Sequence, residues 1–116
     1  MHLSMHNWMR AEPIETTIRR LARYGYESIE IGGEPDRYDT KEVKALLDEN
    51  GLRCWGAVTL MFEGLHLPSP DDAVREHTIQ YVKDVITMVK EMDGELVTIV
   101  PATVGKVNPD ATPEEE

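Results

Sequence analysis

Short apolar runs alternate along the chain with longer segments in which apolar residues recur at a helical spacing. The first run covers residues 3–9. Pro13 opens the segment that follows, in which Ile14, Ile18 and Leu21 share one helical face. The pattern therefore predicts a strand followed by a helix.

The same alternation continues in a second unit. Gly25 stands where helices commonly end in a left-handed residue, and residues 28–32 form a compact apolar run behind it. Asp39 is a good N-cap for the next helix, with Glu42 at the capping-box position, and Gly51 is expected to end that helix.

A third strand is predicted over residues 53–60 and a fourth over residues 96–100. Between them, Ser69 and Pro70 offer an N-cap and a first helical residue, and Gly94 is expected to stop the helix. The predicted inward face of this helix consists of Val74, Thr78, Val82, Val85, Ile86 and Val89.

Each predicted strand is separated from the next by a helix, so the strands are joined by crossovers and run parallel. An α/β architecture follows, which both an open flavodoxin-like sheet and a (β/α)8 barrel satisfy. Residues 112–116 have the pattern of the first turn of a further helix, which favours the barrel. We expect residues 1–116 to be a single partial domain of four βα units, the N-terminal half of a (β/α)8 TIM barrel.

Composition narrows the classes of partner. The formal charge is −10 over 116 residues and the basic residues are scattered. This distribution opposes binding to nucleic acid or anionic membranes and suits a protein that binds small molecules. No apolar run approaches the ~20 residues that span a bilayer, and residues 1–10 do not resemble a signal peptide, so we expect a cytoplasmic protein. Cys54, the single cysteine, is expected to be a buried apolar residue rather than a nucleophile.

Three stretches carry a resemblance to a known family: Leu3-Ser-Met-His-Asn-Trp8, Gly25-Tyr-Glu-Ser-Ile-Glu-Ile-Gly-Gly-Glu34, and the block from Ser69 to Asp84 that leads into Gly94. Together they resemble the N-terminal part of the xylose isomerase-like barrels, especially the ketose 3-epimerases and the hydroxypyruvate isomerase relatives. Residues 6–10 and 98–105 also resemble the larger, barrel subunit of bacterial C-glycoside deglycosidases.

The resemblance implies a metal-dependent sugar isomerase/epimerase of carbohydrate metabolism, which abstracts a proton next to a carbonyl with the help of Mn²⁺ or Mg²⁺. Family members hold the metal on two Glu, one Asp and one His at the ends of strands five to eight, and no segment of this sequence matches them. We therefore expect no catalytic residue and no metal ligand in this span. The expected partners are a sugar substrate and either the missing C-terminal half or a second copy of the chain.

Two other functions remain open. The chain could be the barrel subunit of a C-glycoside deglycosidase that cleaves 3-oxo-C-glycosides, which would imply a small partner subunit. It could also be a non-catalytic half-barrel module that pairs with another chain.

In a parallel barrel the active site lies at the carboxyl ends of the strands. His6 and Trp8 end the first strand, Glu34 follows the second and Thr59 ends the third, so the resemblance makes these four residues the expected substrate contacts. For His6, Trp8 and Glu34 a structural role is the alternative. His6 could be a satisfied structural histidine, Trp8 a core aromatic, and Glu34 a solvated carboxylate beside a tight turn.

Other polar residues are weaker candidates for a functional role. Glu30 alternates with its apolar neighbours and is expected to face inward in a structural role. Glu63 and His66 form either an acid/base couple or a solvated loop. The four histidines lack the spacing of a local zinc site, and no glycine pattern indicates a nucleotide site.

Overall fold

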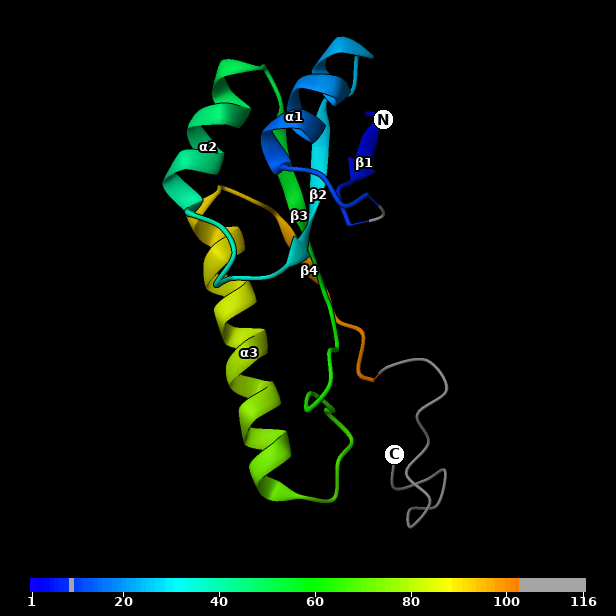
Figure 1. The fold of residues 1–116 in the computed structure, drawn as a ribbon, viewed down its shortest axis with the longest axis vertical. Helices are drawn as coiled ribbons and strands as arrows, with labels where there is room; N and C mark the ends of the chain where they lie inside the picture. Colours follow the sequence, from blue (N-terminus) through cyan, green and yellow to red (C-terminus); the bar gives the residue numbers. More distant parts are fainter. Residues whose placement is uncertain (9, 103–116) are drawn as a thin grey trace.

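The computed structural model describes residues 1–8 and 10–102, and shows a parallel sheet with helices packed on one face (Figure 1). Four strands lie in the order β1-β2-β3-β4, which is also their order along the chain. The strands are β1 (Ser4–His6), β2 (Ser28–Gly33), β3 (Arg53–Thr59) and β4 (Leu96–Thr98). The helices are α1 (Ile14–Arg23), α2 (Thr40–Glu49) and α3 (Asp72–Glu91). The predicted α/β architecture, with parallel strands joined by helical crossovers, is confirmed.

The hydrophobic core lies between the sheet and the helices. Ile29 and Ile31 of β2 have no exposed surface and face the helices, whereas Glu30 between them is half-buried on the other face. In a regular strand, residues three apart face opposite sides of the sheet. A register shift at Ile29/Glu30 lets both Cys54 and Ala57 of β3 face the core although they are three residues apart. The helices contribute mainly Ile18, Leu21, Val43, Leu47, Val85, Met88 and Val89.

The N-cap of α2 is the one that the sequence predicts. The Asp39 carboxylate accepts hydrogen bonds from the backbone N–H groups of Lys41 and Glu42, at 3.0 and 3.1 Å. These bonds satisfy two of the backbone donors that the first helical turn leaves free.

The predicted N-cap of α3 is wrong. Asp71 caps this helix by accepting from the N–H of Ala73, so the helix begins at Asp72. Ser69 lies two residues earlier, where its hydroxyl accepts from the N–H of Asp71 at 3.2 Å and its carbonyl accepts from Arg75 at 2.6 Å. Ser69 therefore stabilises the turn before the helix, and Asp71 is the N-cap.

The residue with a positive φ angle at the helix end is glycine after α1 and α2 but aspartate after α3. Gly25 and Gly51 adopt positive φ angles of 79° and 68°, as the sequence predicts for helix ends. After α3 the left-handed residue is Asp93, with φ 57°, and not Gly94. A Cβ atom on Gly94 would lie 2.6 Å from Val89 Cγ1, so glycine is required there for close packing.

The outer strands are shorter than predicted. Strand β1 covers three residues instead of seven, and β4 ends at Thr98 instead of residue 100. Ile86, which the helical pattern places on the inward face of α3, is 47% exposed, and Ile99 beyond β4 is 49% exposed. Both residues border β4, where no further strand or helix packs on the described part of the chain. Within that part, no helix has the length and apolar character needed to cross a membrane.

Candidate functional site

Strand β1 ends in an aromatic pair. The imidazole of His6 stacks on the indole of Trp8 with the ring centroids 4.1 Å apart and the planes at 22°. His6 is half-buried, and its Nδ1 atom is buried without a hydrogen-bond partner among the described residues. Trp8 is 43% exposed. The pair therefore combines an open aromatic surface with a ring nitrogen that lacks a partner.

Asn7, which the sequence did not single out, fixes the position of this pair. Its Oδ1 atom accepts from the N–H of Gly32 at 2.8 Å, and its Nδ2 donates to the hydroxyl of Tyr38 at 2.9 Å. Burial raises the pKa of Tyr38, although the bond to Asn7 opposes that shift. Asn7 thus joins the end of β1 to the end of β2 and to the loop between β2 and α2.

The two glycines at the end of β2 face opposite sides of the sheet. A Cβ on Gly32 would lie 3.2 Å from Leu60 Cδ1 and 3.4 Å from Trp8 Cβ. A Cβ on Gly33 would lie 2.7 Å from the Val58 carbonyl and 3.0 Å from the Tyr81 hydroxyl. Glycine therefore lets the β1 end approach on one side and α3 on the other.

Tyr81 of α3 links the ends of two strands. Its hydroxyl donates to the Gly33 carbonyl and accepts from the Leu60 N–H, both at 2.7 Å. Burial raises the pKa of Tyr81, so the phenol stays protonated and can donate this bond. The helical spacing that puts Tyr81 four residues before Val85 was the available sequence signal, but it indicates only a buried face.

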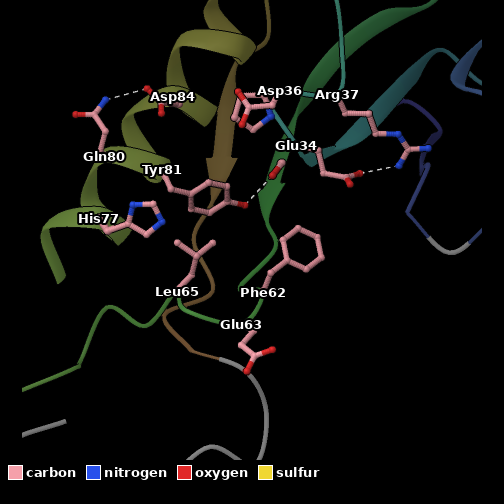
Figure 2. A pocket seen from close by; sticks show the side chains of 12 residues that line it. Glu34, Asp36, Arg37, Phe62, Glu63, Leu65, His77, Gln80, Tyr81 and Asp84 are labelled. Atoms are coloured by element: carbon pink, nitrogen blue, oxygen red, sulfur yellow. Dashed lines mark hydrogen bonds and ion pairs between the residues drawn. The ribbon is translucent and has the colours of Figure 1, made fainter. Parts of the chain in front are cut away.

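Glu34 lies in a cleft of about 600 Å³ between the β2–α2 loop, the β3–α3 loop and α3 (Figure 2). Its carboxylate accepts from Arg37 at 2.8 Å, and this bond raises the pKa of the Arg37 guanidinium. Because Gly33 and Tyr81 also line the cleft, it lies on the helix side of β2, away from Trp8. The cleft is further lined by Asp36, Phe62, Glu63, Leu65, His77 and Asp84.

Thr59 is the least accessible of the four predicted contacts. It is 1% exposed, and its hydroxyl accepts from the backbone N–H of Val100 at 2.8 Å. This bond continues the pairing of β3 with the chain beyond β4. The structure thus brings His6 and Trp8 together, and places Glu34 and Thr59 apart from them and from the open aromatic surface.

The remaining polar candidates do not form a couple. Glu63 is exposed at the cleft, whereas the backbone N–H of His66 donates to Thr78 and its Nδ1 is buried without a partner among the described residues. No hydrogen bond joins Glu63 to His66 within that part of the chain. Likewise, residues 1–8 and 10–102 contain no group of three His, Cys, Asp or Glu side chains that could hold a metal ion.

Comparison with known proteins identifies the fold. A family model described as the xylose isomerase-like TIM barrel matches residues 18–116. The chain belongs to the xylose isomerase-like TIM barrel family. A search of curated proteins found no match.

Solved structures agree with this family. A D-allulose 3-epimerase from Methylomonas sp. is 24% identical with a TM-score of 0.84, and 99% of this chain matches 42% of that protein. A D-psicose 3-epimerase from Clostridium cellulolyticum H10 is 20% identical with a TM-score of 0.76, over 93% of this chain and 42% of that one.

A 3-keto-D-glucoside 4-epimerase from E. coli is 22% identical with a TM-score of 0.75, over 97% of this chain and 44% of that one. The xylose isomerase-like chain thus spans less than half the length of these solved structures. At these identities the likeness establishes the fold alone.

Proposed function

We propose that this chain is the N-terminal part of a metal-dependent sugar isomerase or epimerase that abstracts a proton next to a carbonyl, and that it supplies one wall of the sugar pocket. Family membership and the epimerases among the similar structures support the reaction class. A cytoplasmic location belongs to the same proposal.

The observation that carries the proposal is the unpartnered Nδ1 atom of His6. A buried polar atom without a hydrogen bond costs about 1–3 kcal/mol. In this proposal the His6 ring turns so that its covered Nδ1 atom meets a sugar hydroxyl beside Trp8, and the exposed indole suits the apolar face of a sugar ring. His6 and Trp8 therefore bind and orient the substrate in this proposal.

Asn7 holds that wall in place through its bonds to Gly32 and Tyr38. Glu34 and Thr59, the other two predicted contacts, form hydrogen bonds within the chain. The Glu34 carboxylate accepts from Arg37, and the Thr59 hydroxyl accepts from the N–H of Val100.

Residues 1–8 and 10–102 bring together no group of three His, Cys, Asp or Glu side chains that could hold a metal ion. The proposal therefore assigns Mn²⁺ or Mg²⁺, together with the groups that move the proton, to the other half of the barrel. The chemistry supplied by this chain is limited to binding and orienting the sugar.

The test uses a complete barrel that contains this chain. With Mn²⁺ present, a free ketohexose and a 3-oxo-C-glucoside are supplied in parallel and the products are separated by chromatography. Formation of the epimeric sugar supports the proposal. Release of the aglycone, dependent on a small partner subunit, would show that the chain belongs to a deglycosidase instead.

A further inference from the structure

Asn7 lies between His6 and Trp8, the two residues of the proposed sugar wall. Regular pairing of β1 with β2 ends at His6↔Glu30. The bond from the Asn7 N–H to the Glu30 carbonyl, at 3.1 Å, is the last backbone bond between them in the described part of the chain. Beyond it, Asn7 Oδ1 accepts from the Gly32 N–H at 2.8 Å. This side-chain bond ties the chain to β2 directly before Trp8.

The chemistry of its partners fixes the direction in which the Asn7 amide points. The Gly32 N–H can only donate, so it must meet the amide oxygen, and the Nδ2 group is turned to the Tyr38 hydroxyl at 2.9 Å. A phenol hydroxyl can accept this bond, whereas a phenyl ring offers no such acceptor. Tyr38 therefore holds the amide in the orientation that Gly32 requires.

Tyr38 is itself held in place by its surroundings. It is half-buried and directly precedes Asp39, the N-cap of α2. The Arg37 guanidinium lies 5.3 Å from the centroid of the Tyr38 ring and also donates to Glu34 at 2.8 Å. Burial raises the pKa of Tyr38, so the phenol stays neutral and keeps its own proton. The acceptor for Asn7 is therefore in position within the folded chain.

Trp8 is close enough to Asn7 for this bond to affect it. A Cβ atom on Gly32 would lie 3.4 Å from Trp8 Cβ and 3.7 Å from Asn7 Oδ1, so both residues pack around the same backbone position. Tyr38, by contrast, lines a separate cleft beside α2 and α3. We infer that Tyr38 is a positioning residue for the sugar wall, which sets the place of the Trp8 indole through Asn7.

The role in sugar binding rests on the proposed function, whereas the placement of Trp8 is tested without a substrate. A complete barrel that contains this chain is labelled with fluorotryptophan, and Trp8→Phe and Trp55→Phe assign the fluorine NMR signals of these two residues. Trp55 contacts His2, which precedes β1 at the end opposite to Trp8, and is the internal reference. Tyr38→Phe is expected to move the Trp8 signal by more than its linewidth and to leave the Trp55 signal unchanged.

Turnover of a ketohexose by the same barrel gives the second measurement. Tyr38→Phe is expected to raise KM about fivefold, the equivalent of about one hydrogen bond. The value of kcat should stay within about twofold, because a binding wall contacts the sugar equally in the ground state and the transition state. Tyr26→Phe is the matched control, since Tyr26 is half-buried and its hydroxyl bonds to no described residue. It should leave KM and both signals unchanged.

Asn7→Asp tests the bond by reversing its direction. One carboxylate oxygen still accepts from the Gly32 N–H, and the other can accept the Tyr38 proton, which no described residue receives in the unmutated chain. Asn7→Asp alone is therefore expected to change KM less than about twofold. Combined with Tyr38→Phe, which removes that proton, it should raise KM about fivefold or more.

An unchanged Trp8 signal in Tyr38→Phe would overturn the inference. Equal shifts of the Trp8 and Trp55 signals would also overturn it, because they would show a general loosening of the fold. So would an Asn7→Asp variant that raises KM as much alone as together with Tyr38→Phe. A barrel that turns over no ketohexose would contradict the proposed function, and the Trp8 signal would still decide whether Tyr38 positions the indole.

Discussion

Cys54 packs in the core and is 2% exposed. Its Sγ atom lies so near Gly94 that a Cβ atom on that glycine would be 3.2 Å away. Burial raises the pKa of its thiol to about 11, against an ordinary value of 9.0. The thiolate is therefore scarce at neutral pH, and the thiol is expected to be inert in the folded chain.

This expectation is tested by thiol modification at pH 8. The native chain should react with a disulfide reagent at least about a hundredfold more slowly than the chain in denaturant. Because the folded chain holds the proton more tightly than the unfolded chain, stability should be intact below pH 9 and fall as the pH rises toward 11. Cys54→Ala should show a flatter decline, and rapid native modification would contradict the burial.

His6 offers a second test at a single residue. In a complete barrel, His6→Ala should lower kcat/KM about tenfold or more, because one hydrogen bond to the sugar and the stack on Trp8 are lost. The free energy of unfolding should change by less than about 1 kcal/mol, since the half-buried ring has no internal partner at Nδ1.

His2→Ala is the control for this substitution. His2 contacts the edge of Trp55, with the ring centroids 4.7 Å apart, and precedes β1 at the opposite end from His6. It should leave turnover unchanged. If His6→Ala lowered the melting temperature strongly and left the kinetics intact, His6 would be a structural residue.

Among the elements, α3 is joined to the carboxyl ends of β2 and β3 by Tyr81. Tyr81→Phe would keep the ring but remove the hydroxyl that joins Gly33 and Leu60. We expect a loss of about 2 kcal/mol in the free energy of unfolding by urea, because two backbone groups lose their partner. Tyr24→Phe, at a residue 68% exposed, should cost almost nothing, and an equal loss in both variants would refute the role of Tyr81.

For the whole molecule, the chain alone should bind Mn²⁺ or Mg²⁺ only as weakly as an acidic surface does. Its charge of −10 attracts cations, but the described residues offer no ligand trio. Calorimetry of the full chain should therefore show no one-to-one site of micromolar affinity. Such a site, or isomerase turnover by the chain alone, would show that the metal and the catalytic groups are wrongly assigned to the other half.

Within residues 1–8 and 10–102, the sequence alone determined the number, order and type of the elements. The further helix predicted to begin at residues 112–116 lies outside the described residues. Alternating apolar runs and helical stripes are local signals, and Asp39, Gly25 and Gly51 act within one turn of their own residues. For this reason the parallel α/β arrangement and three helix boundaries could be predicted. His6 and Trp8 could also be proposed as a pair, because both lie at the end of the same short strand.

Only the tertiary structure decided which residues meet across elements. Asn7 reaches Gly32 and Tyr81 reaches Gly33 over separations of 25 and 48 residues, which no local pattern encodes. Tertiary packing also turned Thr59 toward Val100, left Ile86 exposed, and made Asp93 rather than Gly94 the left-handed residue. The physical reason is that local propensity sets the elements, whereas contacts between distant segments depend on how the whole sheet and its helices pack.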